Sequence, residues 1–136
     1  MQKASHTSLL EYIQQDRIFV RMYELYSPNL ELLNALKAKL PYAKIIVISA
    51  YWCPDCKRNV SRMARIAEYL PDWDFEVYSR DTDTIPKELG FVKIIPTFVI
   101  RDAAGKELGR IVENPKLSSL EEDLMSIAKG NYDIQL

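Results

Sequence analysis

Hydrophobic residues in the middle of the chain follow two different patterns in succession. The run Ile45-Ile46-Val47-Ile48 is apolar at consecutive positions, which is typical of a strand that is buried on both faces. Beyond it, apolar residues recur at intervals of three and four: Val60, Met63, Ala64, Ala67 and Leu70. This spacing predicts a helix from Asn59 to Leu70 that ends before Pro71. The pattern therefore predicts a buried strand over 44–49 that leads into an amphipathic helix.

Helical spacing also dominates the residues ahead of this strand. Leu9, Leu10 and Ile13 predict a short helix with Thr7 or Ser8 as its cap. Asp16 is the candidate cap of a second helix with Phe19, Met22, Tyr23 and Tyr26 on one face, although the residues at 18–20 also suit a strand. A third helix is predicted with Ser27 as N-cap and Pro28 at its first position, ending before Pro41. Its apolar face carries Leu32, Leu33, Leu36 and Leu40.

The second half of the chain predicts three further strands and two helices. Strands are expected over 74–78, 97–101 and 106–113, and the last two form a hairpin. A short helix is expected near 86–89, closed by Gly90, and a last helix ends at Ala128. Asn114-Pro115 or Ser118 is the candidate cap of that last helix. The order β-α-β-α-β-β-α predicts an α/β fold, a central mixed sheet of about four strands with helices on both faces.

Composition and charge exclude several function classes. The chain has 18 basic and 19 acidic residues and a net charge of −1, so neither nucleic acid nor an anionic membrane is an expected partner. No apolar run approaches the roughly 18 residues of a membrane span, and the first ten residues lack the apolar segment of a secretory signal. The two cysteines lie in one motif and provide no scaffold of structural disulfides. Because this usage is typical of a reducing compartment, we expect a cytoplasmic protein.

Both cysteines lie in the segment Tyr51-Trp52-Cys53-Pro54-Asp55-Cys56, between the predicted strand and the predicted helix. If Cys53 caps the helix and Pro54 takes its first position, the N–H groups of the first turn favour a thiolate at Cys53. Cys56, one turn further on, lies on the same face and can attack a mixed disulfide formed at Cys53. We therefore predict a redox dithiol in which Cys53 is the nucleophile and Cys56 is the resolving thiol.

Two other uses of the cysteines fit the sequence less well. A structural zinc ion takes about four nitrogen or sulfur ligands, whereas the chain has two cysteines and one histidine, His6. A zinc ion shared between two subunits stays open as an alternative. Inert packing of both thiols does not suit their charged neighbours Asp55, Lys57 and Arg58. We expect no metal and no cofactor other than the redox-active disulfide Cys53–Cys56 itself.

The segment Trp52 to Cys56, together with Ile95-Pro96-Thr97-Phe98 about forty residues later, resembles the thioredoxin superfamily over roughly 42–128. The Trp-Cys-Pro-Asp-Cys variant is similar to small thioredoxin-related proteins rather than to thioredoxin proper, which has Gly-Pro between its cysteines. The resemblance implies a thioredoxin-like fold and a cis peptide bond before Pro96, which would lie against the dithiol. It also implies that Ile95 offers its backbone to an extended substrate segment. The alternative for Pro96 is an ordinary trans proline that enters an edge strand.

Set against this resemblance, the chain departs from thioredoxin at three positions. Thioredoxin has a buried aspartate six residues before the first cysteine, and Val47 stands there in this chain. The lysine partner of that aspartate maps to Val77, and the helix-kinking proline maps to Ser61. The first two changes remove a polar pair from beneath the dithiol. Proton transfer is then left to water or to Asp55.

Asp55, between the two cysteines, bears on the redox potential. Its charge opposes ionisation of Cys53, and Lys57 and Arg58 offset part of this effect. A less stabilised thiolate makes the reduced form less favoured. We therefore predict a reductant with a potential nearer to the thioredoxin value of about −270 mV than to the isomerase value of about −180 mV. An acidic residue in the first turn also stabilises the helix itself, and both effects can hold together.

These features predict a thioredoxin-like disulfide reductase that acts on disulfides in proteins or small molecules. An electron-donating reductase or a low-molecular-weight thiol would recycle it. Tyr51, Trp52, Pro54 and Ile95 are expected to form an apolar collar for substrate, whereas the alternative for Trp52 is packing against the strand ends. A glutaredoxin-like reductase of glutathione-type mixed disulfides is the second candidate, although Ile94-Ile95 replaces the usual Thr-Val before the proline. The third candidate is a non-catalytic thioredoxin-fold module for redox sensing or binding.

The length of 136 residues predicts a single domain over 1–136. Within it we expect a thioredoxin core over 42–130 and an N-terminal helical extension over 1–41. The apolar spacing of the extension suggests helices that pack on the edge of the sheet. Such helices would shape access to the dithiol.

Overall fold

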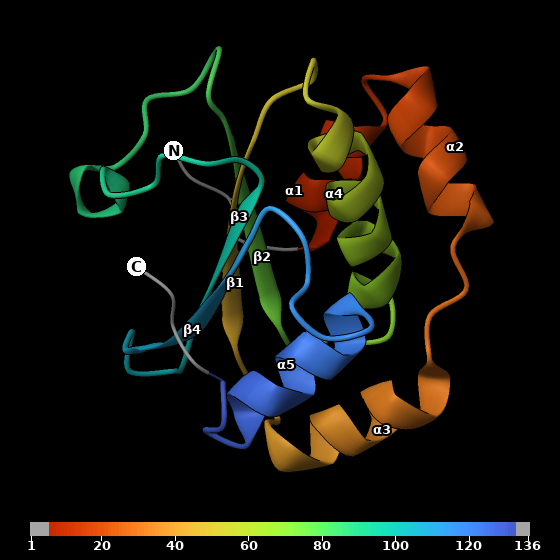
Figure 1. Ribbon diagram of the computed structural model, residues 1–136, viewed down its shortest axis with the longest axis vertical. Helices are drawn as coiled ribbons and strands as arrows, with labels where there is room; N and C mark the ends of the chain where they lie inside the picture. Colours follow the sequence, from red (N-terminus) through yellow and green to blue (C-terminus); the bar gives the residue numbers. More distant parts are fainter. Residues whose placement is uncertain (1–5, 133–136) are drawn as a thin grey trace.

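The computed structural model describes residues 6–132 and contains one mixed sheet of four strands (Figure 1). The strands are β1 (Lys44–Ser49), β2 (Asp74–Ser79), β3 (Thr97–Arg101) and β4 (Glu107–Val112). Their order across the sheet is β2-β1-β3-β4. β1 pairs with β2 in parallel and with β3 antiparallel, and β3 and β4 form the predicted hairpin. The predicted α/β fold with a mixed four-stranded sheet is confirmed.

Five α-helices accompany the sheet in the described part of the chain: α1 (His6–Ile13), α2 (Arg17–Leu25), α3 (Leu30–Lys39), α4 (Pro54–Ala67) and α5 (Leu120–Ala128). Figure 1 shows α1, α4 and α5 on one side of the sheet. The approach of α5 to β4 is close, since a Cβ atom at Gly109 would lie 2.9 Å from the side chain of Ile127. A glycine at this position therefore lets the last helix pack directly on the sheet.

The opposite face of the sheet is covered by the segment around the short 3-10 helix η1 (Lys87–Leu89), which Figure 1 shows on the other side of the strands. Leu89 is buried, and the guanidinium carbon of Arg110 on β4 lies 4.2 Å from the centre of the Phe91 ring. Helices do cover both faces, but the second face has a single short turn where an α-helix was expected.

The three N-terminal helices belong to the same hydrophobic core as the strands. Leu9 and Ile13 of α1 and Phe19 of α2 are fully buried in that core. α1 packs against the edge strand β2 and against α4, whereas α2 packs against α4 and α3 packs against α5. The expectation that these helices lie on the sheet edge therefore holds for α1, while α2 and α3 extend the helical layer.

Several helix boundaries differ from the sequence-based expectations. Asp16 caps α2 as predicted, since its Oδ1 accepts from the N–H groups of Ile18 and Phe19, and the alternative strand at 18–20 is wrong. α1 already begins at His6, ahead of the predicted caps Thr7 and Ser8. α4 ends at Ala67 and a turn follows before Pro71. The segment near 86–89 forms η1, a 3-10 helix, and not a turn of α-helix.

Two predicted caps are wrong for the same physical reason. α3 is capped by Asn29 and not by Ser27, because the N–H of Asn29 is held by the buried carboxylate of Glu121 on α5. α5 is capped by Ser119 and not by Asn114 or Ser118. In the loop before it, Asp123 accepts from the N–H groups at positions 116 and 117. In both places a buried carboxylate on α5 accepts hydrogen bonds from backbone N–H groups ahead of the helix, and the helix begins later than predicted.

Candidate active site

Cys53 begins α4 and receives a hydrogen bond from that helix. It occupies the N-cap, and Pro54 takes the first helical position, as the sequence predicted. The N–H of Cys56 donates to the Sγ atom of Cys53 over 3.3 Å. A backbone donor at a helix N-terminus stabilises negative charge on the sulfur that caps it. The first turn of α4 thus places a backbone donor on the Cys53 sulfur.

Cys53 lies against the segment that precedes β3. Its Sγ atom is 3.8 Å from the carbonyl oxygen of Ile95. The Ile95–Pro96 peptide bond is cis, which is the geometry implied by the resemblance, and not the trans form of an ordinary edge proline. Ile95 and Pro96 are both buried, and the N–H of Glu113 donates to the Pro96 carbonyl over 2.6 Å. The fold therefore brings together the two motifs that lie far apart in the sequence.

The two thiols differ in their access to solvent. Cys53 retains 6% of its surface exposed, whereas Cys56 is completely buried, so an incoming disulfide meets Cys53 first. Burial raises the pKa of the Cys56 thiol to about 12, and its hydrogen bond with Cys53 acts in the same direction. The hydroxyl of Ser49 and the backbone of Ala50 act in the opposite direction. Cys56 is therefore the inner, protonated thiol of the pair at neutral pH.

The sheet beneath the dithiol has no ionisable group at the two positions compared with thioredoxin. Val47 on β1 is fully buried and is paired in register with Val77 on β2. Two residues further along β1, the fully buried Ser49 lies on the same side of the strand as Val47. Its Oγ atom accepts a 2.9 Å hydrogen bond from the hydroxyl of Tyr12. The polar groups under the dithiol are thus two neutral hydroxyls.

The sequence interpretation missed both Ser49 and Tyr12. Ser49 had a detectable signal, since it is the polar end of an otherwise apolar run. Tyr12 had none, because it lies 37 positions from Ser49 and its helical spacing marks it only as another core residue. Only packing of α1 against the strands brings these hydroxyls together.

Tyr51 faces the protein interior and contacts Tyr12. The two rings are stacked with centres 4.3 Å apart and an angle of 17° between their planes. The hydroxyl of Tyr51 donates to the backbone carbonyl of Tyr12 over 3.1 Å, and Phe19 packs edge-on against both rings. Tyr51 is therefore engaged with the N-terminal helices as well as with the motif that it precedes.

The remaining residues of the predicted collar differ in exposure. Trp52 is 63% exposed, so it does not pack against the strand ends. Pro54 is also exposed, whereas Ile95 is buried. Ile94, beside it, is exposed. The exposed apolar residues of the two motifs are thus Trp52 and Pro54, which flank Cys53 in the chain, and Ile94, two residues before the cis proline.

The charges around the motif form two separate pairs. Arg58 forms an ion pair with Asp55 and also donates to Oδ1 of Asn114 over 2.8 Å. Lys57 does not share in this contact, because its Nζ atom lies 3.4 Å from Oδ2 of Asp16 on the N-cap of α2. Of the two cations expected to offset the charge of Asp55, Arg58 is therefore the one in contact with it.

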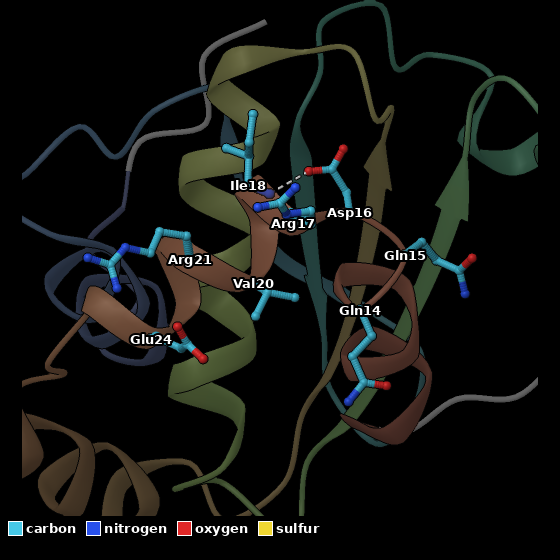
Figure 2. A pocket seen from close by; sticks show the side chains of 8 residues that line it. All are labelled: Gln14, Gln15, Asp16, Arg17, Ile18, Val20, Arg21 and Glu24. Atoms are coloured by element: carbon cyan, nitrogen blue, oxygen red, sulfur yellow. Dashed lines mark hydrogen bonds between the residues drawn. The ribbon is translucent and has the colours of Figure 1, made fainter.

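A surface hollow of about 950 Å³ lies at the turn between α1 and α2, lined by residues between Gln14 and Glu24 (Figure 2). Figure 2 shows Asp16 among the lining residues, with its hydrogen bond to the backbone of Ile18. Neither cysteine lines this hollow. The hollow is therefore separate from the small exposed area of Cys53.

Metal-binding clusters and membrane-spanning helices are both absent from the described residues. Within 6–132, no three His, Cys, Asp or Glu side chains lie close enough to hold a metal ion, and the side chain of His6 is outside the described set. Over the same residues, no helix is both long and apolar enough to cross a membrane.

Comparisons with known proteins agree with this architecture. The sequence matches the family described as Thioredoxin over residues 4–124. The NTD_N/C domain of alkylhydroperoxide reductase AhpF from Enterococcus faecalis superimposes with a TM-score of 0.62 and 16% identity, over 82% of this chain and 56% of that chain. A protein of unknown function from Pseudomonas aeruginosa gives a TM-score of 0.58 and 21% identity, over 96% and 82% of the two chains. An HIV epitope scaffold gives 0.57 and 21%, over 96% and 85%. No curated protein matches the sequence.

The similarity to these solved structures shows a shared fold. The family match is broader evidence, because it extends over most of the chain and includes both the Cys53–Cys56 turn and the Pro96 segment. The order of the elements, the mixed sheet and the cysteine pair at the start of α4 are all consistent with it. The chain therefore belongs to the thioredoxin family.

Proposed function

We propose that this protein is a thiol-disulfide oxidoreductase that reduces disulfides in proteins or small molecules through Cys53 and Cys56. Membership of the thioredoxin family supports a redox function in general terms. The observation that carries the specific proposal is the pairing of a thiol that retains a small exposed area with one that retains none. Cys53 accepts a hydrogen bond from the first turn of α4, and Cys56 lies completely buried behind it.

The reaction proceeds in two exchange steps. The Cys53 thiolate attacks one sulfur of the substrate disulfide, a mixed disulfide forms, and the first substrate thiolate leaves and takes up a proton. Cys56 then loses its proton and attacks the Sγ atom of Cys53. This step forms the Cys53–Cys56 disulfide and releases the second substrate thiolate, which is protonated in turn. Two electrons pass from the dithiol to the substrate.

The proposal requires no bound cofactor or metal, because the cysteine pair itself carries the two electrons. A reductase or a low-molecular-weight thiol would return the oxidised pair to the dithiol. A cytoplasmic location is part of the proposal and rests on the cysteine usage, since both cysteines serve one redox motif. Neither nucleic acid nor a membrane takes part in this scheme.

An extended polypeptide is the substrate that suits the surroundings of Cys53. Trp52 and Ile94 are exposed apolar side chains near the reactive sulfur, and Pro54 is exposed beside them. Exposed aromatic and aliphatic groups of this kind are typical of protein-binding surfaces. The carbonyl oxygen of Ile95 lies 3.8 Å from the Cys53 sulfur, which supports a role of this backbone segment in contacting a substrate chain.

Reduction of insulin by dithiothreitol tests the proposed activity. We expect the wild type to accelerate the reaction and Cys53→Ser to abolish the acceleration. Cys56→Ser should instead accumulate a mixed disulfide with its substrate, which mass spectrometry of the trapped complex would identify. Equal background rates for the wild type and Cys53→Ser would contradict the proposal and favour a non-catalytic module. Turnover limited to glutathione mixed disulfides would favour the glutaredoxin-like alternative.

A further inference from the structure

We propose that Ser49 is a further catalytic residue, whose hydroxyl donates a hydrogen bond to the Cys56 sulfur as this thiol ionises, and that Tyr12 is the positioning residue that orients it. The inference rests on the proposed function and concerns its second exchange step. Two neutral hydroxyls would then stabilise the resolving thiol as it ionises. The sheet beneath it has the uncharged residues Val47 and Val77 at paired positions.

The hydrogen bond between Tyr12 and Ser49 determines which of the two hydroxyls donates and which accepts. The Tyr12 hydroxyl donates to Oγ of the fully buried Ser49 over 2.9 Å, and Tyr12 itself is 7% exposed. A serine hydroxyl has one hydrogen and two lone pairs. Because one lone pair accepts from Tyr12, the Ser49 hydrogen is free to point to a second partner. The Ser49 hydroxyl is also the neighbour whose hydrogen bond lowers the pKa of the Cys56 thiol, which makes Cys56 the candidate for that second partner.

Tyr12 is held in place by contacts other than its hydroxyl. Its ring is stacked on Tyr51, and the Tyr51 hydroxyl donates to the Tyr12 carbonyl. Phe19 packs edge-on at 5.5 Å. Burial also raises the pKa of Tyr12, so the phenol remains protonated and keeps its hydrogen for donation. The tyrosine is therefore a fixed donor over the physiological pH range.

The task of these hydroxyls follows from the chemistry of the second step. The Cys56 thiol must lose its proton before its sulfur attacks the Cys53 sulfur, and burial makes the thiolate costly. The new bond joins the two cysteine sulfurs, the bond from Cys53 to the substrate breaks, and the departing thiolate takes up one proton. A hydrogen bond from Ser49 stabilises the anionic sulfur while it forms.

Among the described residues, the groups that act most strongly on the Cys56 thiol carry no positive charge. From α4 the neighbouring titratable group is Cys53, from α1 it is Tyr12, and from β1 it is the neutral Ser49. The charge of Asp81 acts on Tyr12 and helps to raise the pKa of the tyrosine. Neutral donors are therefore the groups available to the Cys56 thiolate on this side, together with the backbone of Ala50.

A reagent that separates the two steps tests the proposal. Dithiobis(nitrobenzoate) reacts with the full-length reduced protein by releasing one coloured thiol when Cys53 attacks and a second when Cys56 resolves the mixed disulfide. Rapid-mixing absorbance then reports both phases. We expect Ser49→Ala to slow the second phase about ten-fold at neutral pH, the effect of losing one hydrogen bond to a charged group. The first phase should be unchanged.

Three companion variants make the readout specific. Tyr12→Phe keeps the stacked ring and loses only the hydroxyl, and should slow the second phase about three-fold. Ser49→Thr retains a hydroxyl and should restore most of the rate. Ser61→Ala is the matched control, because Ser61 is a fully buried serine on α4 whose Oγ has no hydrogen-bond partner within the described residues. It should leave both phases unchanged.

The pH profile separates a chemical role from a structural one. In Ser49→Ala the second phase should need a pH about one unit higher to reach the same rate. A second phase unchanged in Ser49→Ala and Tyr12→Phe, or slowed equally by Ser61→Ala, would overturn the inference. If Ser49→Ala does not fold by circular dichroism, Tyr12→Phe against the wild type decides. Absence of any first phase in the wild type would instead reject the proposed function.

Discussion

Arg58 neutralises Asp55 within the first two turns of α4, while Lys57 next to it contacts Asp16 on α2. Asp55 was expected to oppose ionisation of Cys53 and to shift the dithiol toward a reducing potential. The ion pair reduces that effect, because the positive charge of Arg58 offsets the negative charge of Asp55. Solvent screens the remaining charge, since the two side chains are 36% and 31% exposed. We therefore expect Asp55 to shift the potential only slightly, because Arg58 offsets its charge.

Substitutions of this pair should shift the redox potential in opposite directions. Asp55→Asn removes a negative charge near the Cys53 thiolate, stabilises the reduced form and should raise the potential. Arg58→Ala frees the Asp55 charge and should lower it. Each shift should stay below about 30 mV, which corresponds to ten-fold in the equilibrium constant. Equilibration of the protein with glutathione buffers measures these potentials.

A matched control for this prediction is Lys57→Gln, which removes a cation that contacts Asp16 in place of Asp55. Its potential should change less than that of Arg58→Ala. The wild-type potential itself should lie nearer to about −270 mV than to about −180 mV. A wild-type value above the second figure, or a downward shift for Asp55→Asn, would contradict the role given to Asp55.

Alkaline pH should destabilise the protein. Burial raises the pKa of Cys56 from 9.0 to about 12 and of Tyr78 from 10.0 to about 12, and the pKa of Tyr26 is raised in the same way. The folded state therefore holds these protons more tightly than the unfolded chain. The stability that they contribute is present below about pH 9 and is lost as the pH rises toward about 12.

Urea denaturation at pH 7, 9, 10 and 11 measures this loss. These pH values run from below the unfolded pKa values into the range between the unfolded and the folded ones. The free energy of unfolding should fall with increasing pH above about pH 9. Tyr26→Phe should flatten that slope, because one of the raised groups is absent. A free energy that stays constant or rises up to about pH 11 would show that these groups keep ordinary pKa values in the folded state.

The buried carboxylate of Glu121 should make Tyr26 important for stability. Glu121 is 1% exposed and accepts from the Tyr26 hydroxyl at 2.6 Å and the Asn29 N–H at 2.8 Å. Tyr26→Phe leaves a buried charge with one donor fewer, which should cost about 1–3 kcal/mol at neutral pH. Tyr69→Phe is the control, since Tyr69 is half-buried, and we expect a change within about 0.5 kcal/mol. Equal effects of the two variants would contradict this role of Glu121.

Removal of residues 1–26 should abolish cooperative folding. The deletion takes away Leu9, Ile13 and Phe19, all fully buried in the shared core. Each such side chain contributes about 1.5–3 kcal/mol, and their sum approaches the total stability of a typical domain, about 5–15 kcal/mol. Thermal unfolding followed by circular dichroism checks the truncated chain.

Point variants test the same contribution within the full chain. Phe19→Ala should cost about 3–5 kcal/mol, whereas Ile18→Ala, at a side chain that is 49% exposed, should cost less than about 0.5 kcal/mol. A truncated protein with an unchanged unfolding midpoint would show instead that the N-terminal helices are a dispensable addition.

The sequence by itself determined the elements whose causes are local. β1 and β3 were expected at the bounds that the structure has, since each is a short run of apolar residues. The placement of Cys53 at the N-cap and Pro54 at the first helical position also follows from neighbouring residues. Asp16 was identified as a cap for the same reason, because a capping side chain bonds within about three residues of itself.

The tertiary structure decided the contacts between residues that are far apart in the chain. Tyr12 and Ser49 are separated by 37 positions, Asp16 and Lys57 by 41, and Tyr26 and Glu121 by 95. Spacing patterns describe which face of an element is buried, but they do not specify which side chain of another element lies opposite. That choice is made by helix packing. It is why the dithiol was predictable from the sequence, while the hydroxyls beneath Cys56 were not.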